Sequence, residues 1–149
     1  MAEKAEESTT VEAAPSAVGP GDPPKGGGGV GDAPTIADLI RRLVEFRDAR
    51  DWRQFHTVKN LMLSLALEAA EVLEIAQWKT DEQVEASLGD PETRRRLEEE
   101  CADVFLYLLM LCERVGIDLP AVAAAKIELN ERRYPADRVR GSSLKYDQF

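Results

Sequence analysis

Two pairs of acidic residues stand beside apolar runs, and their types and spacing could support metal-dependent chemistry. Glu68 and Glu71 form an ExxE pair in "LEAAEVLEIAQW", and Glu100 and Asp103 form an ExxD pair in "EEECADVFLYLLM". Residues three apart are neighbours on the surface of a helix. If both stretches are helical, each helix presents two carboxylates together, next to side chains that are typical of a core.

The helical periodicity places these acids on core-facing surfaces. At ~100° per residue, one stripe about 80° wide contains Leu61, Leu65, Glu68, Val72 and Ile75. Glu71 lies about 60° from Glu68, and Glu74 lies a further ~60° away, so we expect Glu74 to be solvated or to stand beside the inward pair. On the second helix, the face of Asp103 carries three more core-type residues, Leu106, Tyr107 and Met110.

Four unpaired carboxylates in a core would cost several kcal/mol each, so they need protonation, basic partners or a metal. The helix with the ExxE pair has only Lys59 and Lys79 as basic residues, both at its ends. Clustered carboxylate oxygens suit a hard divalent cation such as Mg²⁺. A di-iron centre would need Glu-x-x-His motifs, and the one histidine, His56, lies outside that spacing. The residues therefore favour a magnesium site.

The other acids fit a plain structural role. Glutamate is a good helix former, and Glu98 and Glu99 in "RRRLEEE" are typical of a solvated helix face. A single ExxE is a weak signal, and two such pairs on apolar helices are a stronger one. A noncatalytic helical interaction module with an acidic interface is the alternative to an enzyme at this stage.

Composition and charge limit the partners. The chain has 149 residues, with 28 acidic and 19 basic side chains and a net charge of -9. This balance argues against binding to a nucleic acid polymer, which needs a basic face. No apolar run reaches the roughly 18 residues of a membrane span. With no recognisable N-terminal targeting signal, and two cysteines too far apart on one helix to pair, we expect a soluble cytoplasmic protein without a membrane partner, with the nucleus left open.

The rest of the sequence predicts an all-α protein. Residues 1–34 contain seven glycines and five prolines, which is typical of a disordered low-complexity tail. Helical patterns with capping signals follow at about 36–50, 58–79, 91–115 and 119–133, and a connector with about one helical turn occupies 79–90. We therefore expect a four-helix, bundle-like domain over residues 35–138 and an irregular C-terminal tail over 139–149.

Five separated blocks make the sequence similar to a known family. The order ExxE, 28 residues, ExxD resembles the signature of the all-α MazG-like nucleoside triphosphate pyrophosphatases, in particular their dCTP pyrophosphatase subgroup. The blocks "RDWRQFHTVKNL", "LEIAQWKTD", "KIELNERRYP" and "SSLKY" are also similar to that subgroup and occur in the same order. The resemblance covers about residues 35–147.

The resemblance implies a Mg²⁺-dependent hydrolase of the nucleotide pool. Such an enzyme cleaves dCTP, and modified or noncanonical dCTP, between the α and β phosphates to give dCMP and pyrophosphate. By similarity, the catalytic and metal-binding residues are expected to be Glu68, Glu71, Glu100 and Asp103, with the general base left open. Another nucleotide, such as dUTP or phosphoribosyl-ATP, is the alternative substrate. The family also implies a homodimer or homotetramer, in agreement with helices that are apolar on many sides.

The resemblance also implies a nucleotide pocket. Its expected substrate-binding residues are Trp52, His56, Trp78, Tyr107, Lys126, Asn130, Arg133 and Tyr134. The tryptophans would enclose the base, while Lys126 and Asn130, four apart on one helix face, would contact phosphate and base or sugar. His56 either bonds the base or caps a helix, and Tyr107 lines the sugar pocket or belongs to the core. One position departs from the family, because Leu43 stands in the first helix where relatives carry histidine.

Overall fold

The computed structural model describes residues 33–143 of the chain. The predicted tail at 1–34 lies almost wholly outside the described residues, as does the second half of the predicted tail at 139–149. The described elements are α1 (Ile36–Asp48), η1 (Trp52–Gln54), α2 (Val58–Glu74), α3 (Asp81–Ser87), α4 (Pro91–Val115), α5 (Leu119–Arg133) and α6 (Ala136–Val139). Between residues 33 and 143 there is no strand, and the prediction of an all-α protein is confirmed.

Short polar caps explain where the helices begin. Thr35 and Asp38 form a reciprocal capping box at the start of α1. The Thr57 hydroxyl accepts a hydrogen bond from the Asn60 amide at the start of α2. The carboxylate of Asp118 does the same for Ala121 at the start of α5. These side chains satisfy amide groups that a helix leaves unpaired in its first turn.

Two helix boundaries differ from the sequence prediction. The helix predicted over 58–79 ends at Glu74, because the amides of Ala76 and Gln77 turn back to carbonyls only three residues earlier. The predicted one-turn connector is instead the seven-residue helix α3, which begins with a capping box between Thr80 and Gln83. The chain reverses between these helices at Trp78, where φ is 64°. The early end of α2 therefore places Trp78 in a turn rather than on a helix face.

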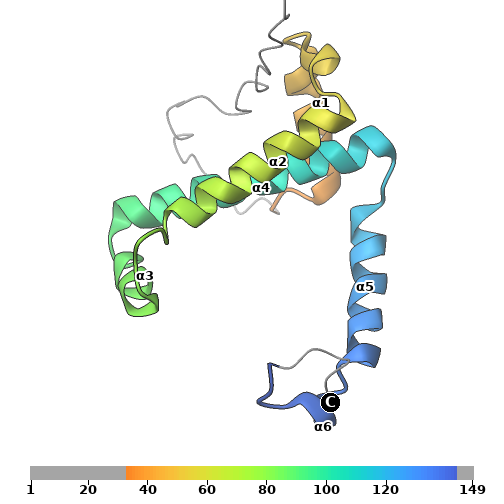
Figure 1. Ribbon diagram of the computed structural model, residues 1–149. Coiled ribbons are helices and arrows are strands. Elements are labelled where there is room, and N and C mark those ends of the chain that lie inside the picture. The colour runs from red at the N-terminus through yellow and green to blue at the C-terminus, as the bar shows by residue number, and fades with distance from the viewer. Residues whose placement is uncertain (1–32, 144–149) are drawn as a thin grey trace, which may run out of the picture. The chain divides into compact units, whose positions relative to one another are not determined.

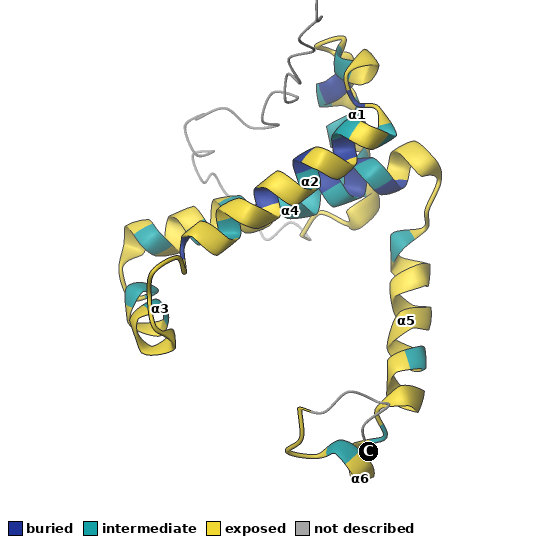
Figure 2. Cartoon of the chain, viewed as in Figure 1, coloured by how far each residue is buried: buried dark blue, intermediate teal, exposed yellow. Residues whose placement is uncertain are grey.

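The chain divides into two compact units, Met1–Arg114 and Val115–Phe149. In the first unit, α2 and α4 lie side by side and run in opposite directions (Figure 1). Buried residues gather where α1, α2 and α4 meet, as Figure 2 shows. The second unit holds α5 and α6. The boundaries predicted for a single domain, 35–138, stay a prediction.

The core of the first unit is small and joins three helices. Leu61 of α2 packs with Tyr107 and Met110 of α4. Leu43, Leu65 and Leu111 pack against this cluster and are partly buried. Burying each such side chain stabilises the fold by roughly 1.5–3 kcal/mol, so this cluster fixes α2 against α4 and determines which of their other residues meet.

A partly buried ion pair ties α1 to α4. Arg47 is 4% exposed, and its Nη1 lies 3.1 Å from Oε2 of Glu113, while its Nε lies 2.7 Å from Oδ1 of Asp48. Next to it, the guanidinium of Arg50 lies 3.6 Å above the ring of Phe46. The same guanidinium lies 5.8 Å from the ring of Trp52, a contact that helps to keep η1 close to the end of α1. None of the described helices is long and apolar enough to cross a membrane.

Candidate metal centre and nucleotide site

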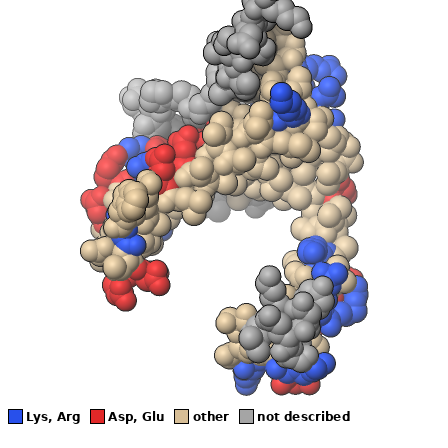
Figure 3. All heavy atoms as spheres, in the orientation of Figure 1, with Lys and Arg blue, Asp and Glu red and all other residues tan. Residues whose placement is uncertain are grey.

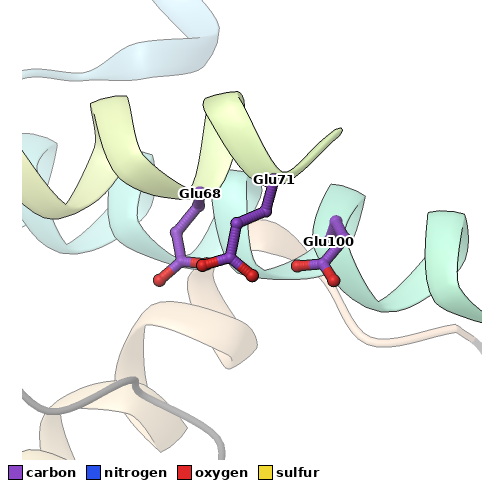
Figure 4. Close-up of side chains that lie close together, drawn as sticks. All are labelled: Glu68, Glu71 and Glu100. Carbon is purple, nitrogen blue, oxygen red and sulfur yellow. The ribbon is translucent and has the colours of Figure 1, made fainter. Parts of the chain in front are cut away.

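Three of the four predicted acids come together between α2 and α4. One carboxylate oxygen from each of Glu68, Glu71 and Glu100 lies within 4.8 Å of the others. Figure 4 shows the Glu68 and Glu71 side chains leaving α2 and the Glu100 side chain leaving α4, with their carboxylates turned to the same side. Because the helices run in opposite directions, ExxE on one and ExxD on the other meet at the same level. The pairing of the helices therefore converts two local patterns into one cluster.

The cluster brings several carboxylates close together in a partly buried place, where their negative charges repel one another. Glu68 is 6% exposed, and burial, followed by the charges of Asp103, Glu71 and Glu100, raises its pKa to about 7. Asp103 is partly buried, and burial and the neighbouring carboxylates raise its pKa too. Its Oδ1 is buried without a hydrogen-bond partner. A bound cation would stabilise the ionised form of carboxylates that are packed together with few hydrogen-bond donors.

The donor set fits a hard divalent ion. All the converging atoms are carboxylate oxygens, which Mg²⁺ and similar ions prefer, and no histidine or cysteine belongs to the described cluster. Glu71 is exposed and Glu100 only partly buried, so one side of the cluster is open to water and to a ligand. Glu68 and Asp103 form its buried side. The cluster can therefore hold a divalent cation and still admit phosphate oxygens from solvent.

One basic residue near the cluster escaped the sequence analysis. Arg96 of α4 places its Nη2 2.9 Å from Oε2 of Glu74 on α2, and its Nε 3.7 Å from Oε1 of Glu100. Glu74 was expected to be solvated or beside the inward pair, and it is exposed and ion-paired across the helices. A signal existed in the sequence, since Arg96 is four residues before Glu100, which is one helical turn. Its neighbours Glu98 and Glu99 are exposed, as predicted.

Trp52 and His56 lie together in the first unit. Trp52 is partly buried and meets the ring of Phe46 edge-on, at 5.8 Å between centroids. The His56 ring lies 6.3 Å from that of Trp52 and is 2% exposed, and neither of its ring nitrogens has a hydrogen-bond partner. Burial, followed by the nearby charge of Arg47, lowers the pKa of His56, which favours the neutral ring. The cap of α2 comes from Thr57, so capping does not explain His56.

The other predicted nucleotide-binding residues differ in exposure. Trp78 is 93% exposed and therefore available to a ligand or another chain, whereas Tyr107 is 1% exposed and belongs to the core cluster. Lys126 and Asn130 are exposed on successive turns of α5, and Arg133 and Tyr134 are exposed at its end. These four residues belong to the second unit. Their roles in binding stay predictions.

An all-helical fold with carboxylates converging from ExxE and ExxD motifs defines a class of metal-dependent phosphate hydrolases, and comparisons with known proteins agree. The MazG-like family matches residues 63–149, and the chain belongs to that family. It is 44% identical to dCTP pyrophosphatase 1 of Homo sapiens over 116 residues, which is 78% of this chain and 68% of the relative. The identity to dCTP pyrophosphatase 1 of Bos taurus is 42% over 113 residues, 76% of this chain and 67% of the relative.

A solved structure gives the same result for the fold. The crystal structure of a pyrophosphatase from Archaeoglobus fulgidus is 42% identical to this chain, with a TM-score of 0.63. The match covers 67% of this chain and 92% of that structure. The chain thus spans about two thirds of its curated mammalian relatives and nearly all of the archaeal protein.

Proposed function

We propose that the protein is a nucleoside triphosphate pyrophosphatase that hydrolyses dCTP, and modified or noncanonical dCTP, to dCMP and pyrophosphate. The observation that carries the proposal is the convergence of Glu68, Glu71 and Glu100 within 4.8 Å, with Asp103 beside them, in a chain 44% identical to a dCTP pyrophosphatase. A hydrolase of this kind clears unwanted nucleotides from the cytoplasmic pool, and a nuclear share of that task is left open.

We assign Mg²⁺ as the cofactor, held by the four acids. When bound, it supplies charge neutralisation for the phosphate oxygens and lowers the pKa of a water molecule. The ExxE and ExxD side chains would hold the ion between α2 and α4, with the open side of the cluster left for the reacting phosphate. One of these carboxylates would accept the proton of the attacking water, with the general base among the four left open.

The nucleoside end of the substrate is assigned to the aromatic residues. Trp52 and the exposed Trp78 offer flat surfaces for the base. His56 is assigned with them, although its two unpartnered ring nitrogens are buried in the free protein. Lys126 and Asn130 on α5, with Arg133 and Tyr134, are assigned to phosphate, sugar and base contacts. Leu43 packs against the core and presents no polar group, so base recognition here would not use the first-helix histidine that the family resemblance implies.

We also propose that the protein acts as a homodimer or homotetramer. Four large apolar residues of α2 are exposed: Met62, Leu63, Leu67 and Leu73. Met62 and Leu73 lie on the side of the helix opposite Glu68 and Glu71. Figure 3 shows few charged side chains over the middle of the first unit, while acidic and basic residues crowd its end near α3. Exposed apolar residues of this kind are typical of a surface that another subunit covers.

A panel of nucleoside triphosphates tests the activity. Each is incubated with the protein and Mg²⁺, and the products are separated as monophosphate or diphosphate. We expect dCMP and pyrophosphate from dCTP, no product when EDTA replaces Mg²⁺, and lower kcat/KM for the other nucleotides. Release of dCDP and inorganic phosphate would exclude cleavage between the α and β phosphates. A higher kcat/KM for dUTP would agree with the proposed cleavage reaction but would contradict dCTP as the preferred substrate.

A further inference from the structure

Arg96 bridges the two helices that carry the acid cluster. It lies one turn before Glu100 on α4, and its ion-pair partner, Glu74, lies one turn after the ExxE pair on α2. The contact to Glu74 is a hydrogen bond of 2.9 Å, whereas the approach to Glu100 is a longer 3.7 Å. Glu74 therefore holds the guanidinium at the end of the cluster, beside one of the metal ligands assigned above.

Its neighbours on α4 are held differently. Arg94 pairs with Glu98, and Arg95 pairs with Glu92 and Glu99, all within the same helix. Only Arg96, of these three, reaches α2 and an acid of the cluster. This difference makes Arg94 a matched control, because it has the same charge and helix but no contact with the site.

The geometry of Arg96 leaves part of the guanidinium available. Its described contacts use Nη2 and Nε, so the Nη1 edge is left for solvent or a ligand. The side chain is 46% exposed, which gives a ligand access to that edge. A guanidinium offers five donors in a rigid fork that matches phosphate oxygens. The cluster thus combines carboxylates for a cation with an oriented cationic donor for an anion.

The charge of the substrate identifies that anion. A nucleoside triphosphate carries most of its charge on the β and γ phosphates, and a single divalent ion leaves part of it uncompensated. Building on the function proposed above, we propose that Arg96 binds the phosphates that leave as pyrophosphate and that Glu74 is the positioning residue that orients its guanidinium. A charge-assisted contact of this kind is among the stronger hydrogen bonds of proteins.

The test compares Arg96→Gln, Arg96→Lys and the control Arg94→Gln. Calorimetry with Mg²⁺ measures the binding of inorganic pyrophosphate, and separately of dCMP, to each protein. We expect Arg96→Gln to weaken pyrophosphate binding by about tenfold or more while dCMP binding is unchanged. Arg96→Lys should recover part of the affinity as a point charge, and Arg94→Gln should match the unmodified protein. Glu74→Gln should give a smaller loss, because the guanidinium is kept but not oriented.

A second readout separates substrate binding from metal binding. The affinity for Mn²⁺ without nucleotide should stay the same or rise in Arg96→Gln, since the change removes a positive charge near the acids. Equal pyrophosphate binding in Arg96→Gln and Arg94→Gln would overturn the proposal. So would a parallel loss of Mn²⁺, dCMP and pyrophosphate binding, which would indicate damage to the cluster. If the unmodified protein released no pyrophosphate from any nucleotide, the proposed function would fail independently of Arg96.

Discussion

A buried carboxylate that faces other carboxylates is costly as an ion until a cation reaches it, and Glu68 is such a residue. Its side chain is almost fully buried between α2 and α4, and its pKa is raised to about 7. Oδ1 of Asp103 is also buried without a hydrogen-bond partner, which adds to the cost of negative charge at this place. The site therefore favours a bound cation. Without a metal ion, the protein should be less stable at high pH than at low pH.

The pH dependence follows from the sign of the Glu68 shift. Its ordinary pKa is 4.5 and its folded pKa is about 7, so the folded protein holds the proton more tightly than the unfolded chain. The free energy of unfolding should fall as the pH rises from about 4.5 to about 7, by up to about 3 kcal/mol from this group. Urea unfolding in EDTA at pH 5 and pH 8, for the unmodified protein and Glu68→Gln, measures it.

Glu68→Gln serves as the reference because it removes the titrating group and leaves the others. The difference between the two proteins should change with pH in EDTA, and Mg²⁺ should restore the stability of the unmodified protein at pH 8. A difference that stays constant across this range would contradict the burial of an uncompensated Glu68.

The sequence identified the acids but not all of their surroundings. Helical periodicity placed Glu68 beside Glu71, because it is a local property. That Glu100 joins them was predicted from the need of buried carboxylates for a metal and from the family resemblance. The pairing of Glu74 with Arg96 depends on the register between α2 and α4, which no local pattern contains. The burial of His56 has the same origin, since it depends on how η1 packs after α1.

At the scale of elements, the helices were predictable and their ends were less so. The limits of α4 and α5 agree with the prediction, because proline, glycine and an aspartate cap mark them in the sequence. The end of α2 was placed too late, since "IAQW" has a good helical composition but folds as turns. Local turns, in which the Ala76 and Gln77 amides bond to carbonyls three residues earlier, end the helix there and leave Trp78 exposed.

The ion pair between Arg47 of α1 and Glu113 of α4 gives a prediction at the scale of elements. Arg47→Ala should lower the free energy of unfolding by roughly 2 kcal/mol, less than the usual loss for a fully buried pair, because Glu113 keeps some contact with water. Arg41→Ala removes exposed pairs within α1 and should cost less than about 0.5 kcal/mol. Urea unfolding of both variants measures these values, and equal losses would show that the buried pair contributes nothing special.

At the scale of the whole molecule, we expect another subunit to cover the exposed apolar residues of α2. Met62→Glu combined with Leu73→Glu places two charges at exposed positions of α2 that lie about 120° or more around the helix from Glu68 and Glu71. We expect the unmodified protein to run as a dimer or tetramer in light scattering coupled to size-exclusion chromatography, and the double variant to run as a smaller species. An unmodified protein that is monomeric at micromolar concentration would contradict the proposed self-association.

The central claim is that the ExxE and ExxD acids form one divalent-metal site, and Mn²⁺ binding without nucleotide tests it most directly. Electron paramagnetic resonance measures free Mn²⁺ in titrations of the unmodified protein, Glu68→Gln, Glu100→Gln and the exposed control Glu98→Gln. We predict that the first and last bind alike and that the two site variants bind at least about tenfold more weakly while keeping their helical circular dichroism. Equal Mn²⁺ affinity in all four proteins would contradict the account.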